Sequence, residues 1–283
     1  MWPLSPHWQD PLAPGAPGSI IQSAAGLRAR VLGQNTRAIV FLHGLGASLH
    51  YWGRAYDALA ARARLIFVDL IGFGGSAKPT GTYDIACHVA ALQATIAELR
   101  TTEAILVGHS TGGLIAMALG TERPRLVDRV IGFGVPIFPS AEAARQHIHR
   151  LGLMARLMAD DVPLAKRMCR LMCDHRELAR AVAPWLAPRL PAAVAADGVN
   201  HIWDSYSGTF RIVVHENRAR EWGESLADRL SLVYGSEDRS CPPAAAQATL
   251  GETLSPEVIP GCDHHLPLRR AEVALRLIQR VVK

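Results

Sequence analysis

The sequence predicts an α/β fold, in which a mostly parallel sheet of eight strands has helices on both faces and carries an inserted helical cap. Three observations support this prediction. Short apolar runs of strand character alternate with helical segments along most of the 283 residues. Several of these runs end in glycine-rich turns, and such turns lie together at the ligand-binding edge of a parallel sheet. From residue 140 to about residue 206, helical periodicity dominates and no clear strand is found.

The expected strands are apolar and bounded by turn residues. In chain order they cover residues 19–22, 27–32, 38–42, 64–68, 105–107, 126–132, 230–234 and 255–259. The first two form an antiparallel hairpin across a short Ala-Ala-Gly connection. Helices are expected over 52–61, 83–99, 114–119, 141–158, 162–173, 176–183 and 270–282, with a helix or irregular link over 210–222.

The stretch 104–113 organises the rest of the chain. An apolar run passes directly into Gly108-His109-Ser110-Thr111-Gly112, and a buried helix follows. A strand that breaks into a helix through Gly-x-Ser-x-Gly is a nucleophile elbow, whose turn leaves no room for a Cβ at either glycine. The serine hydroxyl then lies before a helix N-terminus, whose N–H groups stabilise an oxyanion. Such a serine needs a histidine and an acid from elsewhere in the chain.

The domain boundaries follow from where the strand pattern stops and resumes. Residues 1–136 and 211–283 are predicted to form the core, and residues 137–210 a helical cap inserted after the sixth strand. Three prolines, at positions 184, 188 and 191, are expected to break the helical pattern of the cap. Such a cap would cover the strand edge where the glycine-rich turns lie.

Composition excludes several classes of function. Thirty Lys and Arg residues against 25 Asp and Glu are interspersed, without a basic block, so nucleic-acid binding has little support. No apolar run reaches membrane-spanning length, and the proline-rich start lacks the features of a signal peptide, which makes a cytoplasmic protein the expectation. The five cysteines are scattered; Cys169, Cys173 and nearby His175 could hold a metal, but buried apolar thiols are the favoured interpretation.

Five motifs in chain order resemble those of the α/β-hydrolase superfamily, in its serine-nucleophile, esterase-like branch with a helical cap. They are His43-Gly44-x-Gly46, the Asp69 to Ser76 turn, the elbow at 108–112, Gly235-Ser236-Glu237-Asp238 and Gly261-x-x-His264. The resemblance covers roughly residues 18–282. It implies the α/β-hydrolase fold for the sheet and helices described above.

The resemblance and the chemistry together assign roles. Ser110 attacks an acyl carbon, His264 moves its proton, and Asp238 holds the imidazole in the required tautomer. The backbone N–H groups of Thr111 and, by resemblance, Leu45 are expected to form the oxyanion hole.

Each partner of the serine has competitors nearby. His265 competes with His264 for the role of base, and Glu237 and Asp263 compete with Asp238 for the role of acid. Asp69 also ends a strand, but it is expected to brace its own glycine turn.

A substrate pocket is expected beneath the cap. The candidate lining residues are His43, His109, Met154, Met158, Trp185 and His265. His43 is expected mainly to shape the oxyanion loop, and His109 to act in packing or behind the reacting groups. The cap methionines and aromatics fit an adaptable apolar pocket and equally well fit packing of the cap onto the sheet edge.

The favoured function is hydrolysis of a carboxylic ester of a small to medium apolar substrate through an acyl-enzyme, with no metal and no organic cofactor. C–C bond hydrolysis, thioester cleavage, acyl transfer and cofactor-free perhydrolysis remain alternatives on the same triad, and a small-molecule receptor of this fold is a more distant one. The expected partner is a small acyl substrate, with no nucleic acid and no membrane span, in a monomer or homodimer.

Overall fold

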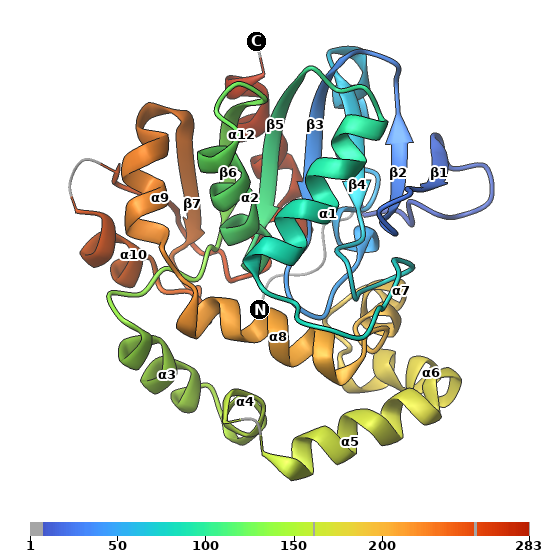
Figure 1. Cartoon of the computed structure of the whole chain (residues 1–283), viewed down its shortest axis with the longest axis vertical. Coiled ribbons are helices and arrows are strands. Elements are labelled where there is room, and N and C mark those ends of the chain that lie inside the picture. Colours follow the sequence, from blue (N-terminus) through green and yellow to red (C-terminus); the bar gives the residue numbers. More distant parts are fainter. Residues whose placement is uncertain (1–7, 161, 252–253, 283) are drawn as a thin grey trace.

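The structure is a computed structural model that describes residues 8–160, 162–251 and 254–282 (Figure 1). Its single sheet has the strand order β1-β2-β4-β3-β5-β6-β7-β8. Strand β2 runs antiparallel to both of its neighbours, β1 and β4, and all other neighbouring strands are parallel to each other. The strands are β1 (Ser19–Gln22), β2 (Arg28–Leu32), β3 (Arg37–Leu42), β4 (Arg64–Val68), β5 (Glu103–His109), β6 (Val127–Phe133), β7 (Leu230–Gly235) and β8 (Glu257–Ile259). The predicted fold class and the predicted hairpin are confirmed.

Helices cover both faces of the sheet, because alternate residues of each central strand are apolar on both sides. Val40 and Leu42 of β3 pack into one core with α1 (Ile85–Glu98), α2 (Thr111–Glu122), α9 (Ala219–Leu226) and α10 (Pro243–Leu250). Ile39 and Phe41 pack into the other with α11 (Leu266–Arg269), α12 (Ala271–Val281) and the 3₁₀ helices η1 (Leu49–Trp52) and η2 (Asp57–Ala61). A third 3₁₀ helix, η3 (Ala227–Arg229), precedes β7.

The cap stretch is helical, as predicted, with different breaks. It contains α3 (Ala141–Arg150), α4 (Leu153–Ala159), α5 (Pro163–Asp174), α6 (Arg176–Leu186), α7 (Ala192–Asp197) and α8 (Trp203–His215). Gly152, with φ of +128°, divides the expected helix over 141–158. Pro184 was expected to break the chain but lies inside α6, two residues before the helix ends. The predicted domain boundary at residue 210 falls within α8, which is continuous.

Two helices of this stretch bind directly to the core. Helix α8 lies across the carboxyl ends of the strands, with α3 to α6 farther from the sheet (Figure 1). Ser205 of α8 donates a hydrogen bond to the Gly72 carbonyl oxygen at 2.9 Å. At the end of α7, Asp197 accepts hydrogen bonds from His50 Nδ1 at 2.7 Å and from Arg180 at 3.1 Å. Among the described residues, none of the helices is long and apolar enough to cross a bilayer.

Candidate active site

Ser110 lies at the junction of β5 and α2 in a strained backbone conformation. Its φ of +52° and ψ of −126° lie in a region that side chains rarely adopt. The two flanking glycines are enforced by packing. A Cβ at Gly108 would lie 2.5 Å from the Gly112 carbonyl oxygen, and a Cβ at Gly112 would lie 2.4 Å from the His43 carbonyl oxygen. The steric requirement predicted for both elbow glycines is therefore met.

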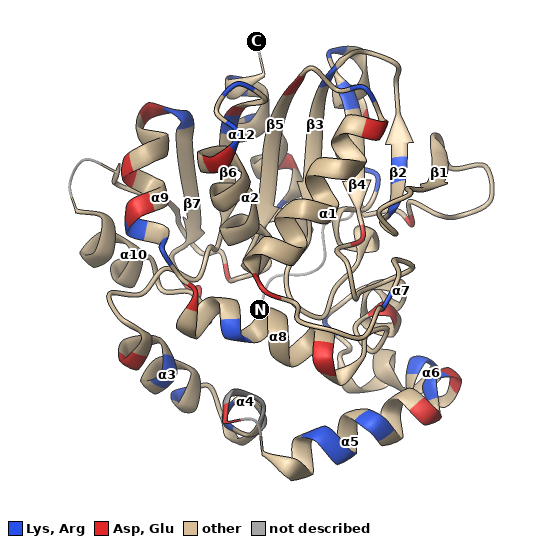
Figure 2. Ribbon diagram, viewed as in Figure 1, with Lys and Arg blue, Asp and Glu red and all other residues tan. Residues whose placement is uncertain are grey.

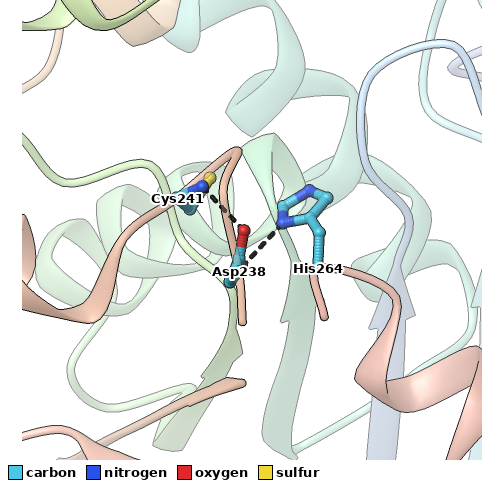
Figure 3. A group of neighbouring side chains, drawn as sticks. All are labelled: Asp238, Cys241 and His264. Carbon is cyan, nitrogen blue, oxygen red and sulfur yellow. Dashed lines mark hydrogen bonds and ion pairs between the residues drawn. The ribbon is translucent and has the colours of Figure 1, made fainter. Parts of the chain in front are cut away.

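His264 and Asp238 meet although 26 residues separate them. Asp238 follows β7 and His264 follows β8, two neighbouring strands, so both loops lie at the same sheet edge. The His264 Nδ1 to Asp238 Oδ2 distance is 2.9 Å (Figure 3). Because a carboxylate accepts, Nδ1 carries the proton and Nε2 of the neutral ring is left with a lone pair. The predicted base and acid are thus hydrogen-bonded partners.

Backbone groups fix the Asp238 carboxylate in place. Its Oδ1 atom accepts from the backbone N–H of Ser240 at 2.9 Å and of Cys241 at 2.8 Å, and the side chain is fully buried. The competing acid Asp263 forms an ion pair with Arg269 at 2.9 Å. Asp69 accepts from the backbone N–H groups of Leu49 and Gly75 at 2.6 and 2.7 Å, so it braces the glycine turn as expected.

Gly134 lies against the His264–Asp238 pair, and sequence reasoning did not single it out. Its φ is +55°, and a Cβ there would lie 3.0 Å from both Asp238 Oδ2 and His264 Nδ1. The sequence signal was weak, since a single glycine after a strand forms no motif. The position tolerates no side chain without disturbing the pair.

The loop after β3 is shaped by His43. Its Nδ1 donates to the Gly44 carbonyl oxygen at 2.7 Å, and its Nε2 accepts from the Leu70 N–H at 3.0 Å. Burial lowers the pKa of His43, which keeps the ring neutral and able to serve both roles. His43 is fully buried and is absent from the described lining of the cavity beside Ser110, so its assignment to the substrate pocket is corrected.

Two other histidines of the prediction do line that cavity. His109 Nε2 donates to the His264 carbonyl oxygen at 2.9 Å, and its ring stacks on Tyr51 with centroids 4.4 Å apart. Burial and the neighbouring His264 and His265 lower the pKa of His109 well below its ordinary value. Burial and His264 likewise lower the pKa of His265 to about 4. Tyr51, which also lines the cavity, was missed because an aromatic residue in a short 3₁₀ helix gives no periodic signal.

The cavity beside Ser110 has a volume of about 490 Å³. Ser110, His264 and residues of the loop after β3 form one side, and residues between 183 and 199 form the other. Its apolar lining includes Leu45, Ala183, Leu186, Leu190 and Val194.

The cap residues that were predicted to line the pocket are not found among the described lining residues of this cavity. Trp185 is 84% exposed and is not among the described lining residues, so its prediction is wrong: it lies on the outer side of α6. The side chains of Met154 and Met158 lie outside the described part of the structure.

A second, larger cleft of about 980 Å³ adjoins the first. The two share His264, His265, the last residue of α6 (Leu186) and two residues that follow it (Ala187 and Leu190). The second cleft is more polar, and its lining includes Ser236, Glu237, Arg239, Ser240, Asp263 and Arg269. His264 therefore stands between an apolar and a polar chamber.

Potential metal ligands were compared across the described residues. There, Asp238, Cys241 and His264 form the one group of three whose ligand atoms lie within 4.8 Å of one another (Figure 3). The hydrogen bonds to Asp238 account for this closeness, and burial with Asp238 raises the pKa of the Cys241 thiol well above its ordinary value. A protonated thiol is a poor metal ligand. Cys169 and Cys173 form no such group among these residues, and burial raises the pKa of Cys169 to about 12.

The structure resembles solved structures of several hydrolases. The structure resembles that of E-2-(acetamidomethylene)succinate hydrolase, with a TM-score of 0.71, 20% identity, and coverage of 93% of this chain and 98% of the other. It also resembles a thermophilic esterase of Thermogutta terrifontis, with a TM-score of 0.68, 18% identity, and coverage of 94% and 98%. At these identities the likeness concerns the fold.

Similarity in sequence alone is more local. An uncharacterized protein of Mycobacterium tuberculosis is 36% identical over 94 residues, which are 33% of this chain and 28% of the relative, so this chain spans less than a third of that protein. The sequence model described as the alpha/beta hydrolase family, however, matches residues 39–276. That match covers most of the chain and all five motifs. The protein therefore belongs to the alpha/beta hydrolase family.

Proposed function

We propose that the protein is a serine hydrolase that cleaves carboxylic esters through an acyl-enzyme. The observation that carries the proposal is the 2.9 Å bond between His264 and Asp238 at the rim of the cavity that Ser110 also lines. Support comes from the strained serine turn and from the family to which the chain belongs. Each of these features is what nucleophilic acyl transfer requires.

In the proposed mechanism, His264 Nε2 accepts the Ser110 proton as the hydroxyl oxygen attacks the ester carbonyl. Asp238 stabilises the resulting imidazolium without taking its proton. Thr111 begins α2, so its backbone N–H lacks an intrahelical partner and can donate to the oxyanion together with that of Leu45. The imidazolium then protonates the leaving alcohol, and His264 next activates water to release the acid.

The two chambers suggest how an ester would lie. The leaving oxygen must be within reach of His264, so the alcohol group is assigned to the polar cleft on the far side of that ring. The acyl group is assigned to the apolar chamber of about 490 Å³, which is in the range of small-molecule sites. This assignment favours esters with a small to medium apolar acyl group and tolerates polarity in the alcohol.

The test uses p-nitrophenyl acetate and butyrate, together with a fluorophosphonate that labels activated serines. The wild type is expected to turn over both esters and to be labelled, whereas Ser110→Ala should lose labelling and lose about 10⁵-fold or more in kcat. A wild type that is neither labelled nor active on any ester would contradict the proposal. A single slow turnover that leaves a stable adduct would instead support the small-molecule receptor.

The choice of base is tested by a matched pair of variants. His264→Ala should lose nearly all activity, while His265→Ala should retain the hydrolytic step because its ring does not contact Asp238. Near-normal rates in His264→Ala would transfer the role of base to His265. Cleavage of a vinylogous diketone in preference to esters would favour the C–C hydrolase alternative.

A further inference from the structure

The outer side of the cap bears an apolar surface that is not needed to hold the cap together. Helices α5 and α6 follow one another at the side of the cap remote from the sheet (Figure 1). Each has an apolar stripe with the spacing i, i+4, i+7, which places its members on one helix face. The stripes and the adjoining Leu186 form what we call the outer cap face: Leu164, Met168, Leu171, Leu178, Val182, Trp185 and Leu186.

The residues of the outer cap face are between 41% and 84% exposed. Packing within the cap uses other residues of the same helices, since Ala165, Cys169 and Ala183 are buried. Seven large apolar side chains exposed on two consecutive helices exceed the scattered single residues that are normal on a protein surface, which points to a docking site. Its two stripes are therefore available to a partner.

The charges around this face indicate what the partner is. The segment 163–189 has six basic and two acidic residues, and basic residues recur along α5 (Figure 2). Arg180 forms an ion pair with Asp197 and Arg176 donates to the His201 carbonyl oxygen, whereas Arg167, Arg170 and Arg189 are exposed, as are the two acidic residues. Amphipathic helices with leucine and tryptophan on one side and arginine or lysine beside them bind at the interface of anionic membranes. Self-association through this face would bring like charges of two copies together, which is unfavourable.

We propose that the outer cap face docks the protein on a lipid surface that contains anionic headgroups. The apolar stripes would enter the boundary between headgroups and acyl chains, with Trp185 at the level of the headgroups. The basic residues would remain in the headgroup layer. Such binding is peripheral and reversible.

The position of Leu186 connects this surface to the catalytic cavity. Leu186 is 80% exposed and also lines both chambers beside His264. Docking would therefore bring the mouth of the cavity close to the lipid. An ester held in that layer could then reach Ser110 along an apolar path, a step that rests on the proposed function, whereas the docking itself does not.

The experiment measures co-sedimentation of the full chain with vesicles of phosphatidylcholine alone and of phosphatidylcholine with phosphatidylglycerol. The wild type is expected to pellet with the anionic vesicles and to be released by salt. Leu171→Glu and Leu178→Glu should each lower the partition coefficient by about ten-fold or more, because each removes a leucine from the apolar layer. Ile20→Glu is the matched control: Ile20 is 47% exposed but lies on β1, and its variant should bind as the wild type does.

A spectroscopic readout reports the orientation of the docked protein. Brominated lipid should quench the tryptophan fluorescence of the wild type, and Trp185→Phe should lose this quenching while it still sediments. Circular dichroism and the thermal midpoint confirm that each variant is folded, so the result does not depend on any enzyme activity.

Three outcomes would overturn the proposal. The wild type would stay in the supernatant with both kinds of vesicle, or both leucine variants would sediment as the wild type does. A dimer in gel filtration that Leu171→Glu and Leu178→Glu convert to a monomer, without vesicle binding, would show that the face joins two copies of this chain.

Discussion

The edge of the sheet around Ser110 and the outer cap face are built in opposite ways. At the sheet edge, each important group is held by several short contacts: Asp238 accepts three hydrogen bonds, and a Cβ at Gly108 or Gly134 would meet other atoms at 3.0 Å or less. On the outer cap face, large apolar side chains extend into solvent. Residues at the sheet edge are held in one geometry by the fold, whereas residues of the outer cap face make few contacts within the protein and are available to bind a partner. Substitutions should therefore cost activity or stability in one region and only binding in the other.

After removal of the nucleophile or of the base, the largest effect is expected from Asp238→Asn. The amide would keep the size of the side chain, but its NH₂ group could face His264 Nδ1 and favour the wrong tautomer. We expect kcat to fall by about 10⁴-fold with little change in the thermal midpoint. Asp263→Asn, one of the competing acids, is the control and should stay within a few-fold of the wild type; the reverse pattern would exchange their roles.

Gly134→Ala should have the next largest effect. The new methyl group would lie 3.0 Å from both Asp238 and His264, so the pair would have to shift by a few tenths of an ångström. Because a misplacement of about 1 Å costs on the order of 100-fold in rate, we expect a loss of about 10-fold. Gly251→Ala is a matched control, because Gly251 also has a positive φ, +75°, but no described atom beyond its chain neighbours lies within 4 Å of the added Cβ. Equal rates in the two variants would mean that only backbone strain matters at Gly134.

Asp197 connects the cap to the core, because it is bonded to Arg180 of α6 and to His50 of η1. We test this connection with Asp197→Asn. Burial raises the pKa of Asp197, but the hydrogen bonds from His50 and Ser48 and the charges of His50 and Arg180 outweigh burial and lower it below its ordinary value of 3.8. The charged form therefore stabilises the folded state above that pH, and this stabilisation is lost as the pH falls through the lowered pKa.

We expect Asp197→Asn to reduce the free energy of unfolding by about 1–3 kcal/mol at pH 7. Urea unfolding should show the difference from the wild type shrinking toward pH 3. Asp160→Asn, which alters a more exposed pair with His149, should change stability by less than about 1 kcal/mol. A difference that grows as the pH falls would contradict the assigned sign.

The smallest effect is expected on the outer cap face. Leu178→Ala, at a residue that is 66% exposed, should change the free energy of unfolding by about 0.5 kcal/mol or less. Leu114→Ala, in the fully buried part of α2, should cost about 2–5 kcal/mol. Comparable losses at both positions would mean that Leu178 is packed in solution and that the face is not free to dock.

Local chemistry explains which features the sequence predicted well. Strand periodicity and glycine turns predicted the sheet, since backbone geometry restricts those positions to few residue types. The partnership of His264 and Asp238 was implied by the resemblance of their two turns to the family's motifs. The structure brings them together because both residues follow neighbouring parallel strands.

The wrong or missing predictions concern residues whose position or role depends on their neighbours in the folded protein. The cap aromatics were expected to line a pocket or to pack the cap, but nothing in the sequence sets the direction in which Trp185 faces, and it is 84% exposed. Pro184 was expected to end a helix that continues for two residues beyond it. Gly134 and Tyr51 carried no motif, and only their neighbours in space give them importance.

The backbone at Ser110 has a consequence for how this protein can evolve. Its φ of +52° suits glycine better than serine, so Ser110→Gly should relieve strain of about 1–3 kcal/mol. Selection for heat resistance alone would thus reward loss of the hydroxyl. Retention of serine at this turn in lineages that grow hot would indicate that turnover, and not durability, is what selection maintains.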